Sequence, residues 1–221
     1  MQQVLSKKSS VQPKSRYKMS DNPDVLFEIN NDDLNLCLWQ RKQDHRTLSE
    51  VATFRPFQLR DRRIATTQKT FEKDIETIMI DQSVDPSLCC VLRADLQRLA
   101  NIFFSVSLSS DTRFRLFTTI DDDCRRFHVD YQHLRMICTY QGPGTEWLTD
   151  DQANRAAYAA GAPNEDIIRF GAPSRFETSW VGFMKDDGFP GNRGGGFMHR
   201  SPSLAGSQDV RVVFCLESAR L

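Results

Sequence analysis

A change of periodicity near the middle of the chain limits the possible folds more than any other feature. From about residue 112 apolar residues alternate with polar ones, the period of a β-strand, and turn-forming stretches such as QGPGTEW and DDGFPGNRGGG separate the alternating segments. So many short alternating segments are typical of a barrel or a jelly roll. The pattern predicts seven strands, over residues 113–119, 124–130, 134–140, 166–170, 178–184, 196–199 and 210–216.

Two amphipathic helices precede this region. The first covers about residues 67–82, and the second begins after Asp85-Pro86, an N-cap followed by proline at the first helical position. Both carry apolar residues at helical spacing, so each should cover a sheet. We therefore expect an α+β, mainly β domain: a double-stranded β-helix, that is, a jelly-roll or cupin-like barrel over about residues 112–217, with helices over about 67–105 packed outside it.

The remaining chain and its composition restrict the class of protein. Residues 1–22 are rich in Ser, Lys, Gln and Pro, so we expect a disordered tail before a single domain over 23–221. Basic and acidic residues number 29 each, which argues against nucleic acid as a partner. No segment offers the ~20 apolar residues of a membrane span, and the start lacks the apolar part of a signal peptide. The six cysteines show no C-x-x-C spacing, so we expect reduced thiols in a cytoplasmic protein.

A histidine and an aspartate two residues apart are the first candidates for chemistry. In a strand, His128 and Asp130 point to the same side, while Val129 packs on the other side. Two such side chains can be adjacent ligands of one metal ion, or they can form a hydrogen-bonded structural pair. His199 is the best candidate for a third ligand, because it follows Phe197-Met198 on a later predicted strand. Two histidines and one carboxylate form the facial triad of non-haem iron(II) oxygenases.

Arg211 lies twelve residues after His199, in the last predicted strand. The strand alternates, and its face with Val212, Phe214 and Leu216 is wholly apolar, so the arginine should point into the barrel. A buried guanidinium needs an anion, and its planar fork suits a carboxylate. Tyr140 either donates a hydrogen bond to that bound carboxylate or reaches solvent with its hydroxyl.

The order of these residues resembles that of the iron(II)- and 2-oxoglutarate-dependent dioxygenases. The resemblance rests on His128-x-Asp130, Arg135 with the strand MICTY, then His199 and Arg211, and the segment HVDYQHLRMICTY is most similar to the prolyl-hydroxylase branch. It implies that His128, Asp130 and His199 bind the metal and that Arg211 binds the distal carboxylate of 2-oxoglutarate. That family often has Ser or Thr two residues after the arginine, whereas this chain has Val213.

A second resemblance spans most of residues 25–217. The strings CRRFHVDY, LRMICTYQGPGTEWL and GGGFMHRSP, and the pair Trp39–Arg41, are similar to an uncharacterised bacterial family, a domain of unknown function. This resemblance implies a link to zinc-homeostasis genes and so to metal supply.

Three functions follow from these observations. The first is an iron(II)/2-oxoglutarate dioxygenase, an oxidoreductase that hydroxylates an unknown substrate with 2-oxoglutarate as small-molecule co-substrate. The second is a non-enzymatic metal-binding protein of the same barrel type, one that handles zinc, because two histidines and a carboxylate also suit Zn(II). The third is a ligand-binding or interaction protein in which the three residues are structural.

Overall fold

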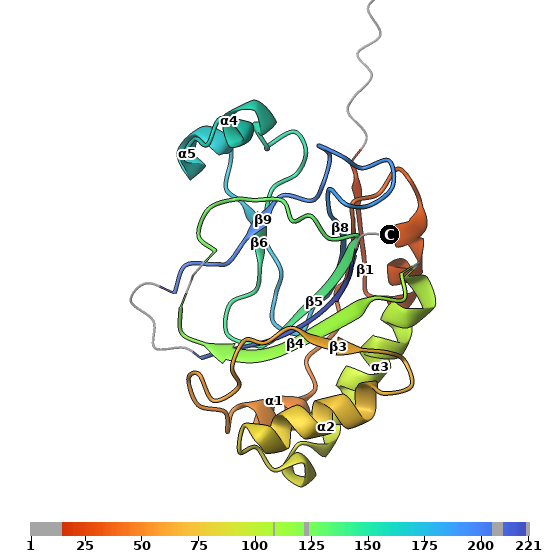
Figure 1. Ribbon diagram of the computed structural model, residues 1–221. Helices are drawn as coiled ribbons and strands as arrows, with labels where there is room; N and C mark the ends of the chain where they lie inside the picture. Colours follow the sequence, from red (N-terminus) through yellow and green to blue (C-terminus); the bar gives the residue numbers. More distant parts are fainter. Residues whose placement is uncertain (1–14, 108, 122–123, 205–209, 220–221) are drawn as a thin grey trace, which may run out of the picture.

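A seven-stranded sheet forms the centre of the fold (Figure 1). The computed structural model describes residues 15–107, 109–121, 124–204 and 210–219. Neighbouring strands are antiparallel, except that β1 and β2 are parallel. In order across the sheet the strands are β1 (Tyr17–Ser20), β2 (Leu36–Trp39), β8 (Val181–Lys185), β5 (Leu134–Gln141), β10 (Arg211–Ser218), β4 (Thr112–Thr119) and β3 (Ile64–Thr66).

A three-stranded sheet packs against one face of the large sheet (Figure 1). Its strands are β7 (Ser174–Arg175), β6 (Glu146–Trp147) and β9 (His199–Arg200), and one isolated bridge places His128 beside β9. Within the described residues no strand pairing joins the two sheets, so the predicted closure into a barrel is not observed. Apolar side chains fill the space between the sheets; they are Leu36, Leu38, Ile137, Trp147, Phe176, Met184, Phe197, Val213 and Cys215.

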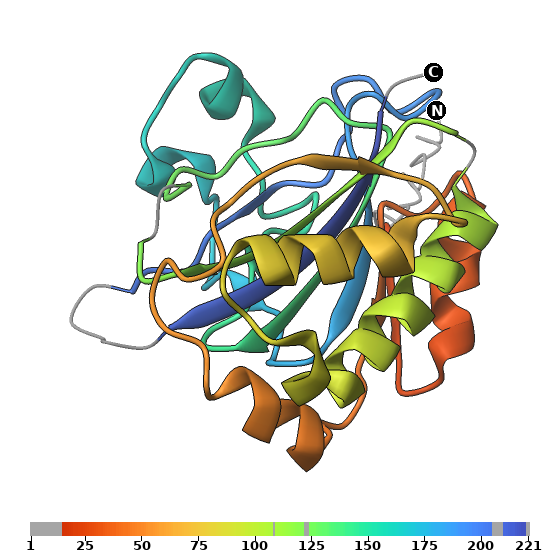
Figure 2. The same cartoon turned by 60° about the horizontal axis from the view of Figure 1, so that its bottom comes forward.

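Helices cover the other face of the large sheet (Figure 2). The helices pack there because each has one apolar face. In helix α2, for example, the buried residues recur at the spacing of one helix face; they are Phe71, Ile75, Ile78 and Met79. The short helices α4 and α5 lie apart from the others, beyond the small sheet (Figure 1). The helices are α1 (His45–Val51), α2 (Phe71–Asp81), α3 (Cys90–Val106), α4 (Arg155–Ala159) and α5 (Asn164–Ile167), with 3-10 turns η1 (Pro23–Asn30) and η2 (Pro86–Leu88).

The central strands separate two apolar cores. All eight residues of β10 are buried, and they alternate between the two sides of the sheet. Val212, Phe214 and Leu216 belong to the core beneath the helices, whereas Val213 and Cys215 belong to the core between the sheets. We call these the helix face and the inner face. Since both faces are covered, a charged side chain in the middle of β5 or β10 must be buried as well.

Besides the barrel closure, three predicted segments differ clearly from the structure. Residues 17–20 were expected in a disordered tail, but they form β1, because pairing with β2 and a contact between the rings of Tyr17 and Trp147, 5.1 Å apart, hold them. Residues 1–14 of that tail lie outside the described residues. Residues 124–130 form only a bridge instead of a strand, and 166–170 form the end of α5 and a second bridge. In each segment the backbone pairs with its neighbour at a single bridge.

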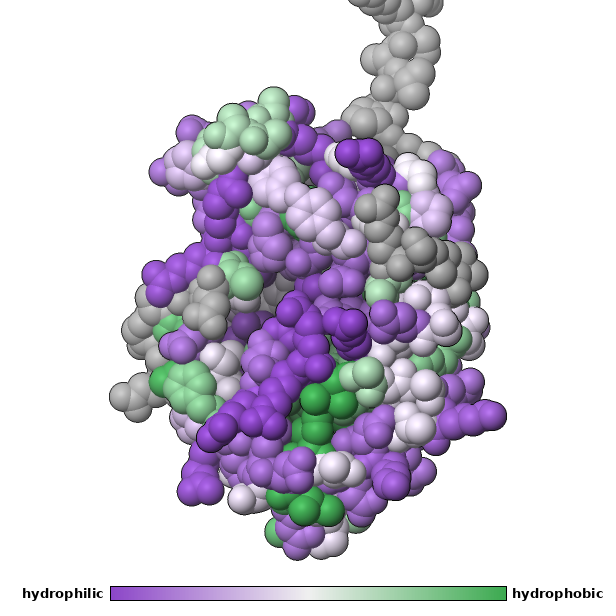
Figure 3. Space-filling model, viewed as in Figure 1, coloured by the Kyte–Doolittle hydropathy of each residue, from purple (hydrophilic) through white to green (hydrophobic). Residues whose placement is uncertain are grey.

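Three observations concern the surface, the hydropathy of the helices and the cysteines. On the face shown in Figure 3, apolar residues gather only in small, separated patches among hydrophilic ones. No helix in the described ranges is long and apolar enough to cross a membrane. All six cysteines are free thiols.

Candidate metal centre

The structure brings His128, Asp130 and His199 together. One possible ligand atom from each residue lies within 4.8 Å of the others. The backbones of His128 and His199 form two reciprocal hydrogen bonds, of 2.9 and 3.0 Å, which place the two imidazole rings 4.6 Å apart. Phe127 and Val129 point the opposite way, into a separate apolar cluster. The alternation of side chains that the sequence predicted for this segment is therefore present, although the segment is bridged at only one point.

Backbone carbonyls fix the orientation of both imidazole rings. Nδ1 of His128 lies 2.9 Å from the carbonyl oxygen of Arg126, and Nδ1 of His199 lies 3.2 Å from that of Phe197. A carbonyl oxygen only accepts, so Nδ1 of each ring is the donor. This leaves Nε2 of each ring for the cluster, the arrangement found in protein metal sites.

The charges around the three residues favour a cation. Burial alone would raise the pKa of Asp130, but the His199 imidazole and the Arg135 guanidinium outweigh it and hold that pKa well below its usual range. Burial and the neighbouring His199 lower the pKa of His128. Asp130 is thus ionised and His128 neutral near pH 7, the states in which both can bind a metal.

The distances also fit a metal ion. Two ligand atoms bound at about 2.1 Å and at a right angle would lie about 3.0 Å apart. Nε2 of His199 and Oδ2 of Asp130 are 3.3 Å apart, so a small shift would accommodate the ion. Two nitrogens and one carboxylate oxygen suit iron(II) or zinc(II).

Arg211 lies on the inner face of β10 and is 3% exposed. Its Nε donates to the carbonyl oxygen of Pro143 over 2.9 Å, and Gly142 leaves room for its side chain, because a Cβ there would come within 2.8 Å of its Cγ. Burial lowers the pKa of Arg211 to about 10. In the described part of the chain no carboxylate forms an ion pair with this guanidinium.

Tyr140 does not share the inner face with Arg211, and its assignment to co-substrate binding is wrong. Its hydroxyl donates to Oδ2 of Asp95, on α3, over 2.6 Å, and the side chain belongs to the core beneath the helices. The reason is the alternation within β5: Cys138 and Tyr140 share the helix face, and Ile137 lies on the other face. The same alternation, applied to MICTY, would have given this result from the sequence.

Buried charged residues beside the cluster were missed or left without a role. Arg135 forms an ion pair with Asp130 and another, of 3.0 Å, with Glu217 on β10. Asp186, directly after β8, is fully buried, and burial raises its pKa to about 7. The signal in the sequence is a charged residue within an otherwise apolar strand, as in LRMICTY and VFCLES. His133 is buried against Phe189 and is not among the three clustered residues.

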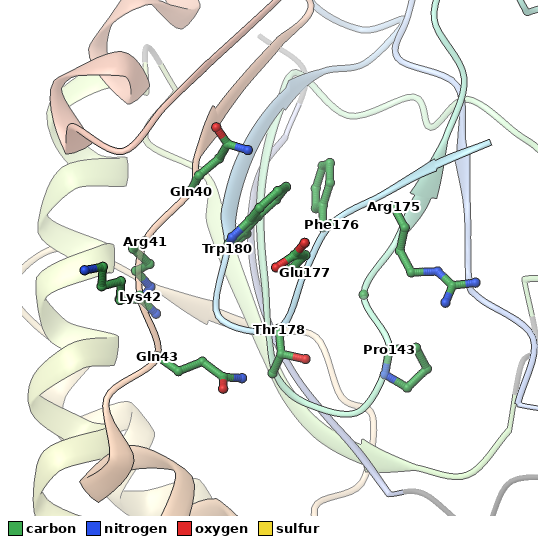
Figure 4. A pocket seen from close by; sticks show the side chains of 11 residues that line it. Gln40, Arg41, Lys42, Gln43, Pro143, Arg175, Phe176, Glu177, Thr178 and Trp180 are labelled. Carbon is green, nitrogen blue, oxygen red and sulfur yellow. The ribbon is translucent and has the colours of Figure 1, made fainter. Parts of the chain in front are cut away.

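A separate hollow of about 780 Å³ lies near the start of β8, next to Trp180, whereas Asp186 follows the other end of that strand (Figure 4). Its lining includes Arg41 and Arg175, but both are already paired. Arg41 binds both carboxylate oxygens of Asp95 at 2.7 and 2.8 Å, and Arg175 binds Glu146. The Trp39–Arg41 pair therefore fixes α3 to the sheet, with the Arg41 guanidinium 5.2 Å from the centre of the Trp39 ring.

Comparison with known proteins supports this fold. A family described as "Protein of unknown function (DUF1826)" matches residues 20–217. Among curated proteins no sequence relative matches the chain. Dioxygenase for auxin oxidation 1 from Arabidopsis thaliana, solved with 2-oxoglutarate, is similar with a TM-score of 0.51 and 8% identity, over 94% of this chain and 93% of that one. This likeness shows a shared fold.

Two further structures are similar at lower scores. The rice dioxygenase for auxin oxidation has a TM-score of 0.43 and 13% identity, over 71% of this chain and 55% of its own. This chain thus spans about half the length of the rice protein. A Pseudomonas putida prolyl-4-hydroxylase has a TM-score of 0.34 and 9% identity, over 81% of this chain and 97% of its own.

Proposed function

This chain belongs to the DUF1826 family of proteins of unknown function, and we propose that it is an iron(II)- and 2-oxoglutarate-dependent oxygenase. The observation that carries the proposal is the cluster of His128, Asp130 and His199, whose ligand atoms lie within 4.8 Å. The strand orders support it. β4, β10, β5 and β8 are consecutive in the large sheet, and His128, β9, β6 and β7 are consecutive in the facing layer, an order that is compatible with the double-stranded β-helix that we propose.

The chain's own residues divide the work of the proposed reaction. His128, Asp130 and His199 would hold the metal on one side and leave its other positions open. When bound, iron(II) would supply the activation of oxygen, and the net reaction would turn 2-oxoglutarate, oxygen and a substrate C–H bond into succinate, carbon dioxide and a C–OH group. Trp147 and Phe197, both buried beside His199, would exclude water from the site.

Arg211 would bind the distal carboxylate of 2-oxoglutarate. A guanidinium that is 3% exposed and has no anion among the described residues carries a large desolvation cost. A carboxylate would remove that cost and accept two parallel hydrogen bonds. This buried cation also distinguishes the oxygenase from a simple metal carrier, since metal binding alone does not need it.

The alternative is a metal-binding protein without catalytic activity, one that handles zinc. The same donor set favours it, because two imidazoles, one carboxylate and a water form a common tetrahedral zinc site. The link to zinc-homeostasis genes stays a prediction, as does the cytoplasmic location.

Co-substrate binding separates the two functions. The protein is purified without a histidine tag, loaded anaerobically with iron(II), and titrated with 2-oxoglutarate; succinate is then measured after oxygen is admitted. We expect binding and oxygen-dependent succinate from the native chain. His199→Ala should lose the metal while keeping the fold, and Arg211→Lys should keep the metal but bind 2-oxoglutarate about 10- to 100-fold more weakly, the loss expected for a bidentate charged hydrogen bond.

One result would exclude the oxygenase. If the native chain binds metal but neither binds 2-oxoglutarate nor forms succinate, the zinc-handling protein takes its place. Equal 2-oxoglutarate binding by the native chain and Arg211→Lys would remove the role of Arg211.

A further inference from the structure

Arg135 is a buried cation that touches a candidate metal ligand. It lies on β5, is 6% exposed, and its Nη1 forms an ion pair with Oδ2 of Asp130. Its Nη2 binds Oε2 of Glu217 at 3.0 Å, so the two arms of one guanidinium hold two carboxylates. Glu217 is 2% exposed, and its other carboxylate oxygen, Oε1, accepts a hydrogen bond from Nε of Arg63 over 2.5 Å.

Fold stability alone does not account for this arrangement. Removing a guanidinium and two carboxylates from water costs several kcal/mol per ion, and well-packed apolar residues of similar size often stabilise a core as much or more. The inner face offers apolar neighbours, since Met184 stands opposite Arg135 on β8. A buried charge at this position is therefore better explained by what its arm reaches, which is Asp130.

Asp130 needs a partner because its backbone is weakly held. The segment around it is not a strand; its nearest ladder contact is the single bridge at His128. One backbone hydrogen bond, from the amide of Asp187 to the carbonyl of Asp130 over 3.0 Å, supports it from the turn that follows β8. The Asp130 side chain is 24% exposed, so without a further contact its carboxylate could turn to solvent.

We propose that Arg135 is the positioning residue of the metal centre: its guanidinium, fixed in turn by Glu217, holds the Asp130 carboxylate where it can share a metal ion with His128 and His199. The inference rests on the metal centre of the proposed function and adds a residue that does not itself touch the metal. A carboxylate has lone pairs for both partners, so the ion pair with Arg135 and a bond to the metal are compatible. The ion pair takes over the role that a regular strand would have had in fixing Asp130.

Arg135→Lys is the decisive variant. Lysine keeps the positive charge, so the electrostatic effect on the metal is retained, but its single ammonium cannot span both carboxylates as the fork does. We expect the variant to bind cobalt(II), used as the probe, about 10- to 100-fold more weakly than the native chain, the usual effect of losing a partner of a metal ligand. The control is Arg115→Lys, the same exchange at an arginine of β4 that pairs with Asp61 and has no part in the site, and this variant should bind cobalt(II) as the native chain does.

A double-mutant cycle distinguishes positioning from a general loss of structure. In the background of Asp130→Asn, Arg135→Lys should cause no further loss of cobalt(II) affinity, because the group that it positions no longer carries the charge. If Arg135→Lys does not fold, Glu217→Gln, which weakens the anchor of the guanidinium, should weaken cobalt(II) binding severalfold. Native affinity in Arg135→Lys, or in Glu217→Gln where that is the folded variant, would overturn the proposal.

Succinate formation is measured separately. If the native chain binds cobalt(II), Arg135→Lys binds it more weakly, and no succinate is formed with iron(II), the positioning role stands and the oxygenase fails. If succinate is formed but Arg135→Lys binds metal normally, the oxygenase stands and the positioning role fails. A native chain that binds no metal would overturn both.

Discussion

Asp186 is a buried acid that should make the stability of the protein depend on pH. It is fully buried, and neither of its carboxylate oxygens has a hydrogen-bond partner in the described part of the protein. Burial raises its pKa from 3.8 to about 7, and the attraction of Arg135 offsets only part of that effect. We expect Asp186→Asn, which cannot ionise, to be more stable than the native chain at pH 8.

The direction and size of the effect follow from the two pKa values. The folded pKa lies above the unfolded one, so the contribution of Asp186 to stability is fully present below about pH 4 and is lost as the pH rises through 7. Values of 3.8 and about 7 differ by about 3, and each pH unit is worth about 1.4 kcal/mol, so the native chain should lose about 4 kcal/mol across this range. Near pH 4 the native side chain is uncharged, as asparagine is, so the variant and the native chain should have similar stability there.

Urea unfolding of both proteins at pH 4.5, 6 and 8 measures this difference. The stability advantage of Asp186→Asn should grow with pH and level off above about pH 7. A variant that is less stable than the native chain at pH 8 would show that Asp186 is ionised and paired in the folded protein, and the reasoning from burial would be refuted.

Three smaller predictions test other parts of the structure. Tyr140→Phe should lower the free energy of unfolding by about 1–2 kcal/mol, because it removes the hydrogen bond to Asp95. It should leave 2-oxoglutarate and metal binding unchanged, and weaker 2-oxoglutarate binding would show that Tyr140 does contribute to the site. Arg41→Lys should cost about 3–5 kcal/mol in thermal or urea unfolding, since it breaks a largely buried bidentate pair with Asp95, and a loss under 1 kcal/mol would contradict this role. Gly144→Ala should cost at least about 1–3 kcal/mol, because its Cβ would lie 2.2 Å from the carbonyl oxygen of Phe176; native stability would mean that this backbone can move apart.

The elements that were predicted well depend on local patterns. Helices α2 and α3 repeat apolar residues at helical spacing, and β10 alternates so regularly that its helix face can be identified from Val212, Phe214 and Leu216. The pair His128 and Asp130 is likewise local, because residues two apart share a side wherever the chain is extended. The same rule places Tyr140 on the face of β5 opposite to Ile137, away from the metal centre.

The sequence by itself determined which side chains could share a face: His128 with Asp130, and Arg211 with the inner residues of its strand. Only the tertiary structure decided which faces meet. The pairing of β9 with residue 128 brings His199 to Asp130, and the register of β5 and β10 places Glu217 opposite Arg135. Such contacts join residues about 70 to 80 positions apart in the chain, and their register depends on packing between whole strands. Periodicity within one segment carries no information about the partner segment, so the charges that surround the metal centre could not be assigned before the fold was known.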